Sequence, residues 1–218
     1  MQTRTLAALA VALVTLSAGC GFLLGNEALE FAANPATVAD DATTETGYEE
    51  TNVTAVNLTQ NVTVADQTRT VRLVNHRATY ERQVDLTGLD TDQRAALLMT
   101  LSSPEIDVAG QTLNPLSGVD ERDIVQRFDT GYEGLQVGQQ VDNRSVRALG
   151  ANRSVEQFEG TATLGGAELD VYVHATTFKH GDDFVTAVAI YPRAVDGEDE
   201  RVVTLLEGLE HERGEGSE

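Results

Sequence analysis

The chain has 218 residues but only one cysteine, Cys20, and only one lysine, Lys179. A single thiol excludes any intramolecular disulfide bond. Lysine and arginine together number 15, against 35 aspartate and glutamate residues. This shortage excludes ordinary nucleic-acid binding, because that needs cationic side chains to neutralise phosphates. We therefore expect no nucleic-acid partner.

The excess of acidic residues indicates a protein that works in concentrated salt. Removing residues 1–19 would take away Arg4 and no acidic residue, which leaves a formal charge of −21. An acidic surface with almost no lysine is typical of proteins from strong brine, where a Debye length of about 3 Å or less screens self-repulsion. An acidic disordered chain is the alternative. The 41% hydrophobic content and long alternating segments favour a folded halophilic domain.

The apolar run at residues 6–16 is too short to span a membrane, which takes about 20 residues, but it is typical of the h-region of a signal peptide. Small residues at 17–19 lead directly to Cys20. This arrangement resembles a lipobox, in which the thiol carries lipid and the upstream peptide is removed. It predicts a lipoprotein signal peptide at 1–19 and a tether at 20–28. The protein would then be anchored to membrane lipid through Cys20 and face outside the cell, held stably by two acyl chains.

Two features depart from the lipobox pattern. Ser17 occupies the place where leucine is usual, and Leu16 stands one step earlier. The segment before the apolar run lacks a twin arginine, so the export route stays open. The alternatives are an ordinary secretory signal with an unrelated cysteine, or an anchor that is not cleaved.

Residues 29–210 are long enough to bury a core, and we predict one α+β domain there, a single antiparallel sheet with helices packed on one face. One helix is expected between Asn34, as its cap, and Gly47, just after its end. A second is expected near 117–128, and a third from about Asp196 with an apolar face.

Alternating apolar residues predict strands through most of the remaining chain. The segment "DQRAALLMTLSSP" is ambiguous between a strand and a helix, and we predict a buried strand. A change of phase after residue 53 predicts a β-bulge near Ala55–Asn57. Residues 211–218 read as a disordered acidic tail.

Five Asn-X-Ser/Thr triplets, or sequons, occur in the chain. N-glycosylation is therefore open to an exported protein at five asparagines: Asn52, Asn57, Asn61, Asn143 and Asn152. The alternative is that asparagine and threonine simply form the polar side of solvated strands. Because a sequon permits modification without requiring it, the sequence leaves both readings open.

No catalytic, metal-binding or cofactor-binding pattern emerges. His76 shares a face with apolar residues, which favours a partly buried core position. His174 and His180 lie six residues apart on one strand, roughly 20 Å in extended chain, too far for one metal ion held by these two alone. A G-x-S-x-G elbow, a Walker loop and an H-E-x-x-H pair are all missing. We predict no cofactor, and the sequence does not indicate an enzyme.

Several segments together carry a family resemblance: "AGCGFLLGNEALEFAANPATV", "ETGYEE", "SSPEIDVAGQTLNPL", "HGDDFVTAVAIYP" and "LLEGLEH". They resemble a family of haloarchaeal lipoproteins of uncharacterised function over essentially the whole mature chain. The half from Val146 to Leu209 more distantly resembles the PsbP-like fold, through its run of strands and final amphipathic helix. These resemblances transfer no catalytic residue.

PsbP-like domains often serve larger assemblies, so the resemblance implies a protein partner. We therefore expect a membrane-anchored, extracytoplasmic lipoprotein that acts as a protein-binding or assembly factor at the haloarchaeal cell surface. A carrier of lipid or small ligands is one alternative, and it would need a deep apolar cavity of roughly 300 Å³ or more. A surface hydrolase is another, and it would need serine, histidine and a carboxylate within hydrogen-bond reach.

Overall fold

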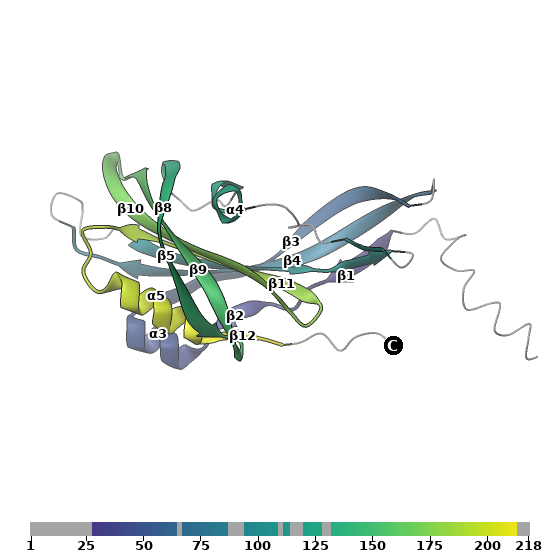
Figure 1. Cartoon of the computed structure of the whole chain (residues 1–218), viewed down its shortest axis with the longest axis horizontal. Helices are drawn as coiled ribbons and strands as arrows, with labels where there is room; N and C mark the ends of the chain where they lie inside the picture. The colour runs from purple at the N-terminus through teal and green to yellow at the C-terminus, as the bar shows by residue number, and fades with distance from the viewer. Residues whose placement is uncertain are drawn as a thin grey trace, which may run out of the picture.

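The computed structural model describes residues 28–64, 67–86, 94–108, 111–113, 120–127 and 132–212. Of these residues, 69% lie in strands and 15% in helices. A sheet of eight strands dominates the molecule (Figure 1). Its strands are β1 (Leu29–Ala32), β3 (Glu49–Val64), β4 (Gln67–Gln83), β5 (Arg94–Pro104), β8 (Glu133–Ala148), β9 (Ala151–Leu164), β10 (Ala167–His180) and β11 (Asp183–Pro192).

Four short strands form two small separate sheets. They are β2 (Ala36–Val38) with β12 (Leu209–His211), and β6 (Ile106–Val108) with β7 (Gln111–Leu113). The helices in the described part of the chain are α3 (Asp40–Thr46), α4 (Glu121–Arg127) and α5 (Glu198–Glu207). None of the helices in the described ranges is both long and apolar enough to cross a bilayer.

The large sheet has β3 at one edge and β8 at the other. β3 pairs with β4 in antiparallel fashion, and the opposite side of β4 pairs with both β5 and β1. Beyond β5 follow β11, β10, β9 and β8, each antiparallel to its neighbour. The short β1 runs parallel to β4, which makes the sheet mixed.

The predicted α+β class, an antiparallel sheet with helices packed on one face, is therefore wrong. The sheet is mixed, and the helices are too short to form a layer over it, with seven, seven and ten residues against strands of up to 17. In Figure 1, α3 and α5 lie together beside one end of the sheet, and α4 lies on its other side. Local capping signals indicated where helices form, but they carried no information about how little of the sheet such short helices cover.

The helix predicted between Asn34 and Gly47 is correct only at its end. Gly47 has a φ of 73°, and its N–H bonds to the carbonyl oxygen of Thr43, which terminates α3. The helix begins at Asp40 rather than near Asn34, because residues 36–38 pair with β12 instead. That pairing partner lies at the far end of the chain, so no local signal could reveal it.

The β-bulge predicted near Ala55–Asn57 is also wrong. The register between β3 and β4 runs without a shift from Asn52 to Val64, and the irregularity lies between Glu50 and Asn52. The phase of apolar residues changes along β3 because both of its faces are exposed. Val53 and Val56, which point to opposite faces, are 40% and 41% exposed.

The centre of the sheet, in contrast, is buried on both faces. β5 is buried at nearly every position, which confirms the strand predicted over "DQRAALLMTLSSP", and β11 has the same pattern. One hydrophobic cluster joins residues of α3 and α5 to one side of these strands, and a second lies on the side of α4. This arrangement follows from the near-continuous apolar sequence of the two strands.

Candidate functional site

The strand β3 leaves an uncharged edge at residues 51–64, which we call the β3 edge. It contains no charged side chain, although 23% of the chain is charged. One side of β3 pairs with β4, and no strand in the described part of the chain pairs with its other side. Edge strands are usually protected by charges, proline or short length, so this long, uncharged strand offers a free row of backbone hydrogen-bonding groups.

The two faces of β3 differ in chemistry. Residues directly opposite each other in an antiparallel pair share a face, so Leu58 lies on the same face as buried Leu73. Val56 and Val62 share this face, and Val62 packs against the small hydrophobic cluster that contains Leu73. We call this row, Val56, Leu58 and Val62, the apolar face of β3. Leu58 is 48% exposed, the largest value among the exposed large hydrophobic residues.

All five predicted sequon asparagines lie at exposed positions. Asn57 and Asn61 lie on the face of β3 opposite to the apolar face, whereas Asn52, at the start of the strand, lies on the same face as Val56 and Leu58 because no bulge separates them. Asn143 lies on β8, the other edge strand, and Asn152 is near the start of β9. The structure thus brings none of them into the core.

Cys20, the predicted lipid attachment site, lies outside the described residues, as do residues 213–218 of the predicted tail. His211, the first residue of that tail, ends β12, and its side chain is fully buried. His76 is half-buried on the face of Ala78 and Tyr80, as predicted.

His211 belongs to a buried chain of hydrogen bonds. Its Nε2 lies 3.1 Å from Asp183 Oδ2, and its Nδ1 lies 2.9 Å from Nδ1 of His180. The carboxylate oxygen accepts from Nε2 of His211, and between the two Nδ1 atoms one carries the proton and the other accepts it. Asp183 Oδ2 also accepts the backbone N–H of Asn34 at 2.9 Å. The group therefore joins the β10–β11 turn, β12 and the segment before β2.

The sequence did not reveal this chain of hydrogen bonds, because two of its directly bonded members, Asn34 and Asp183, lie 149 residues apart. The only local signal was that residues 180–183, His-Gly-Asp-Asp, are of the types that favour a hairpin turn. In the part of the chain that the structure describes, no group of three or more His, Cys, Asp or Glu side chains is arranged to hold a metal ion.

A second set of polar contacts fixes the first turn of α5. Glu198 is fully buried and accepts hydrogen bonds from the Tyr48 hydroxyl, at 2.7 Å, and from Arg82. Burial, followed by the nearby Glu198 charge, raises the pKa of Tyr48 well above its usual value. Tyr48 therefore stays protonated and donates to the carboxylate.

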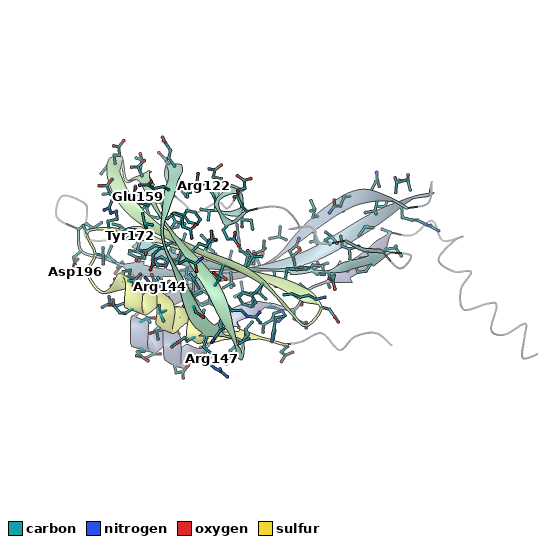
Figure 2. The ribbon with its side chains drawn as sticks, viewed as in Figure 1. Arg122, Arg144, Arg147, Glu159, Tyr172 and Asp196 are labelled. Carbon is teal, nitrogen blue, oxygen red and sulfur yellow. The ribbon has the colours of Figure 1, made fainter. Side chains whose placement is uncertain are left out.

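Asp199, the next residue of α5, contacts Arg144 of β8 and His174 of β10. Its Oδ2 accepts from Arg144 at 2.5 Å, and its Oδ1 lies 3.5 Å from Nε2 of buried His174. Figure 2 shows Arg144 above α5. Nε2 of His174 also lies 3.0 Å from the Tyr191 hydroxyl. Burial lowers the pKa of His174 to about 4, although the Asp199 charge acts in the opposite direction. His174 is therefore neutral near pH 7.

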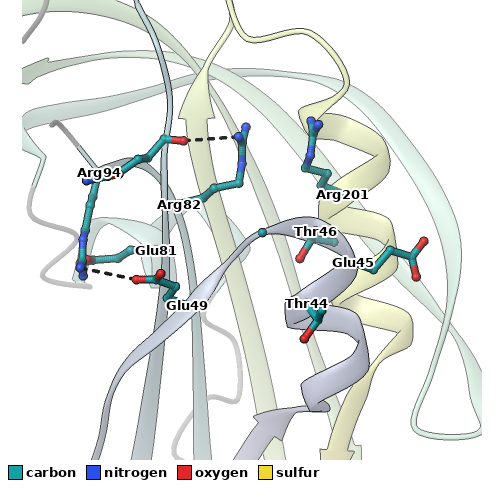
Figure 3. Close-up of a pocket in the computed structure, with 10 residues that line it drawn as sticks. Thr44, Glu45, Thr46, Glu49, Glu81, Arg82, Arg94 and Arg201 are labelled. Carbon is teal, nitrogen blue, oxygen red and sulfur yellow. Dashed lines mark hydrogen bonds and ion pairs between the residues drawn. The ribbon is translucent and has the colours of Figure 1, made fainter. Parts of the chain in front are cut away.

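A pocket of about 550 Å³ lies between α3, α5 and the ends of β4 and β5 (Figure 3). Arginines and glutamates line it in equal number: Arg82, Arg94, Arg201, Glu45, Glu49 and Glu81. The guanidinium groups are already paired, since Arg94 contacts Glu81 at 2.9 Å and Arg82 contacts Glu198. The pocket is thus polar and charge-balanced, unlike the deep apolar cavity that a carrier of lipid needs.

The described contacts of His174 and His180 also give no support to the alternative that the protein is a hydrolase. The described contacts of His174 and His180 reach tyrosine, aspartate and histidine side chains. Neither set of described contacts contains the serine that a Ser-His-Asp arrangement requires.

The chain belongs to a family whose description is "Domain of unknown function (DUF6517)". The family model matches residues 35–210, which include β2 through β12 apart from the final residue of β12. No curated protein matches the chain. Family membership therefore identifies the domain without assigning an activity.

Proposed function

We propose that this protein is a lipoprotein anchored through Cys20 to the outer face of the cell membrane, where it binds a partner protein along the β3 edge. The signal-like segment before Cys20 supports the anchor, and so does the resemblance to haloarchaeal lipoproteins. The more distant PsbP-like resemblance of the C-terminal half supports a role in an assembly.

The observation that carries the binding role is the β3 edge. An extended segment of a partner can add to a free strand edge, so that main-chain hydrogen bonds supply affinity and alternate side-chain contacts supply specificity. Leu58 and Val56 would give the partner apolar contacts on one face. Burying the exposed part of each is worth about 1 kcal/mol.

The charge pattern supports the same surface. The whole chain has a formal charge of −20, so contact elsewhere on its surface would place acidic side chains directly against those of an acidic partner. The uncharged residues 51–64 form a stretch where a strand of an acidic partner can approach without placing like charges opposite one another. The occupant we propose is therefore an extended, largely uncharged segment of another protein.

Site-specific photo-crosslinking in native membranes tests this function. A crosslinking residue at Leu58 should give one recurrent adduct, whereas the same residue at Thr59, on the opposite face, should give much less. The partner so identified should then bind the purified protein in calorimetry, and Leu58→Lys should weaken that binding at least tenfold. Equal adducts at positions 58 and 59, or binding that is indifferent to Leu58→Lys, would contradict the proposal.

A further inference from the structure

The five sequons are distributed unevenly over the sheet. Three lie in β3 and one in β8, the two edge strands, and the fifth is the second residue of β9, next to the β8–β9 turn. The interior strands β4, β5, β10 and β11 contain none. The triplets therefore occur only where the structure leaves an asparagine side chain in solvent.

Hydrogen bonds separate the sequon asparagines from the others. The two described asparagines outside sequons, Asn34 and Asn75, use their side-chain nitrogen to hold the fold. Asn34 Nδ2 donates to the carbonyl oxygen of Glu212, and Asn75 Nδ2 donates to that of Val56, each at 3.2 Å.

Where a sequon asparagine makes a side-chain hydrogen bond, it does so through its oxygen, Oδ1, and not through its nitrogen. Asn61 Oδ1 accepts from the Thr70 hydroxyl at 3.1 Å, and Asn143 Oδ1 accepts from Ser154 at 2.8 Å. Among the residues described, no sequon asparagine donates a hydrogen bond through Nδ2. Nδ2, the atom that would carry a sugar, is thus left to solvent at every sequon.

We propose that these asparagines are N-glycosylated, a modification that depends on the outward placement in the proposed function. The donor is a sugar joined through its anomeric carbon to a lipid phosphate. A bond forms between asparagine Nδ2 and that carbon, while the bond from the carbon to the phosphate oxygen breaks. The lipid phosphate leaves with the electron pair, and a base takes one proton from Nδ2, so no oxidant or reductant is needed.

The geometry gives the glycans a directing role. Asn57 and Asn61 point away from the apolar face, because alternate residues of a strand point to opposite faces. Sugars on these two residues cover the face of β3 opposite to Val56 and Leu58. The sugar on Asn52 stands on the same face as Val56 and Leu58, but roughly 13 Å before Val56 along the strand, so the backbone edge from Val56 onward is left to a partner. At the opposite edge of the sheet, Asn143 and Asn152 share one face, and sugars there cover that face of β8 and of the start of β9.

The test uses the full-length chain, with its own signal segment, recovered from the membranes of a host that exports and glycosylates proteins. Mass spectrometry of proteolytic peptides should find hexose-containing mass additions at the five sequon asparagines and none at Asn34 or Asn75. Thr59→Ala should abolish the addition at Asn57 although the asparagine remains. Thr59→Ser, which keeps the sequon, should retain it. Thr59 is exposed, so both variants are expected to fold.

The same spectrum reports the mass at Cys20, which keeps the two proposals separable. Lipid on Cys20 together with five unmodified asparagines would overturn the glycosylation and leave the anchored function standing. Sugars on a chain that lacks lipid would support the glycosylation and overturn the anchor. Unmodified asparagines and a free thiol would overturn both.

Discussion

Replacing Glu198 offers the sharpest test of the structure, because this fully buried carboxylate holds α5 to the sheet through Tyr48 and Arg82. Glu198→Ala leaves a guanidinium whose side chain is only 18% exposed without its partner, and it removes the acceptor of a buried hydroxyl. Breaking a buried ion pair from one side costs about 3–5 kcal/mol. Such a loss is a large fraction of a total stability of about 5–15 kcal/mol.

Glu198→Gln should cost less, because the amide keeps the shape and one acceptor oxygen. The loss of charge-assisted hydrogen bonds then accounts for about 1.5–3 kcal/mol. The matched control is Glu200→Ala, in the same turn of α5 but exposed, where we expect a change within about 0.5 kcal/mol. This predicts a graded series from Glu200→Ala through Glu198→Gln to Glu198→Ala.

Urea unfolding, analysed by linear extrapolation, measures all three variants at constant salt. The midpoint should fall in the predicted order, and the slope should stay unchanged if only the native state is affected. A Glu198→Ala variant that loses less than about 1 kcal/mol, or no more than Glu200→Ala, would refute the assigned role of Glu198.

Three further predictions concern pH, packing and the β3 edge. The pKa of His174 is about 4 in the folded protein and about 6.5 in the unfolded chain. Between these pH values the unfolded chain binds more protons, so the free energy of unfolding should fall by up to about 3 kcal/mol as the pH drops from 6.5 to 4. His174→Gln should flatten that part of the pH dependence, and an unchanged curve would show that another group causes it. Gly160→Ala should destabilise by about 1–3 kcal/mol, because its Cβ would stand 2.6 Å from the Gln136 carbonyl oxygen; Thr161→Ala, with no such clash, should cost clearly less in the same urea assay. Leu58→Lys should change the urea midpoint little, since Leu58 is exposed, and a loss above about 1 kcal/mol would mean that Leu58 serves the fold rather than a partner.

The sequence was most informative where local chemistry decides the structure. The segment that forms β5 was ambiguous between a strand and a helix, but its prediction as a buried strand is confirmed. Gly47 marked the end of α3 because its left-handed backbone favours glycine. The final helix was also expected, with Val202 and Leu205 on its buried face. Each of these features depends on residues within a few positions of one another.

Features that depend on distant residues were not predictable in this way. The parallel pairing of β1 with β4, and that of β2 with β12, joins segments about 40 and 170 residues apart. Without these pairings the sheet looked antiparallel and α3 looked longer. His211 read as part of a polar tail, because nothing nearby indicates that it contacts His180 and Asp183.

The exposed alternation in β3 also shows how an edge strand can mislead a sequence analysis. Apolar residues on both faces of a strand normally indicate that the strand is buried or contains a bulge. In β3, however, both faces are exposed and one backbone edge has no paired strand among the described residues. In brine, screening over about 3 Å weakens ion pairs between exposed groups, whereas salts that are excluded from protein surfaces strengthen apolar burial. A partner held by backbone hydrogen bonds, Val56 and Leu58 would therefore keep or gain affinity as salt rises. An uncharged edge is thus the kind of interface that an acidic protein can use in strong salt, the solvent we propose for this one.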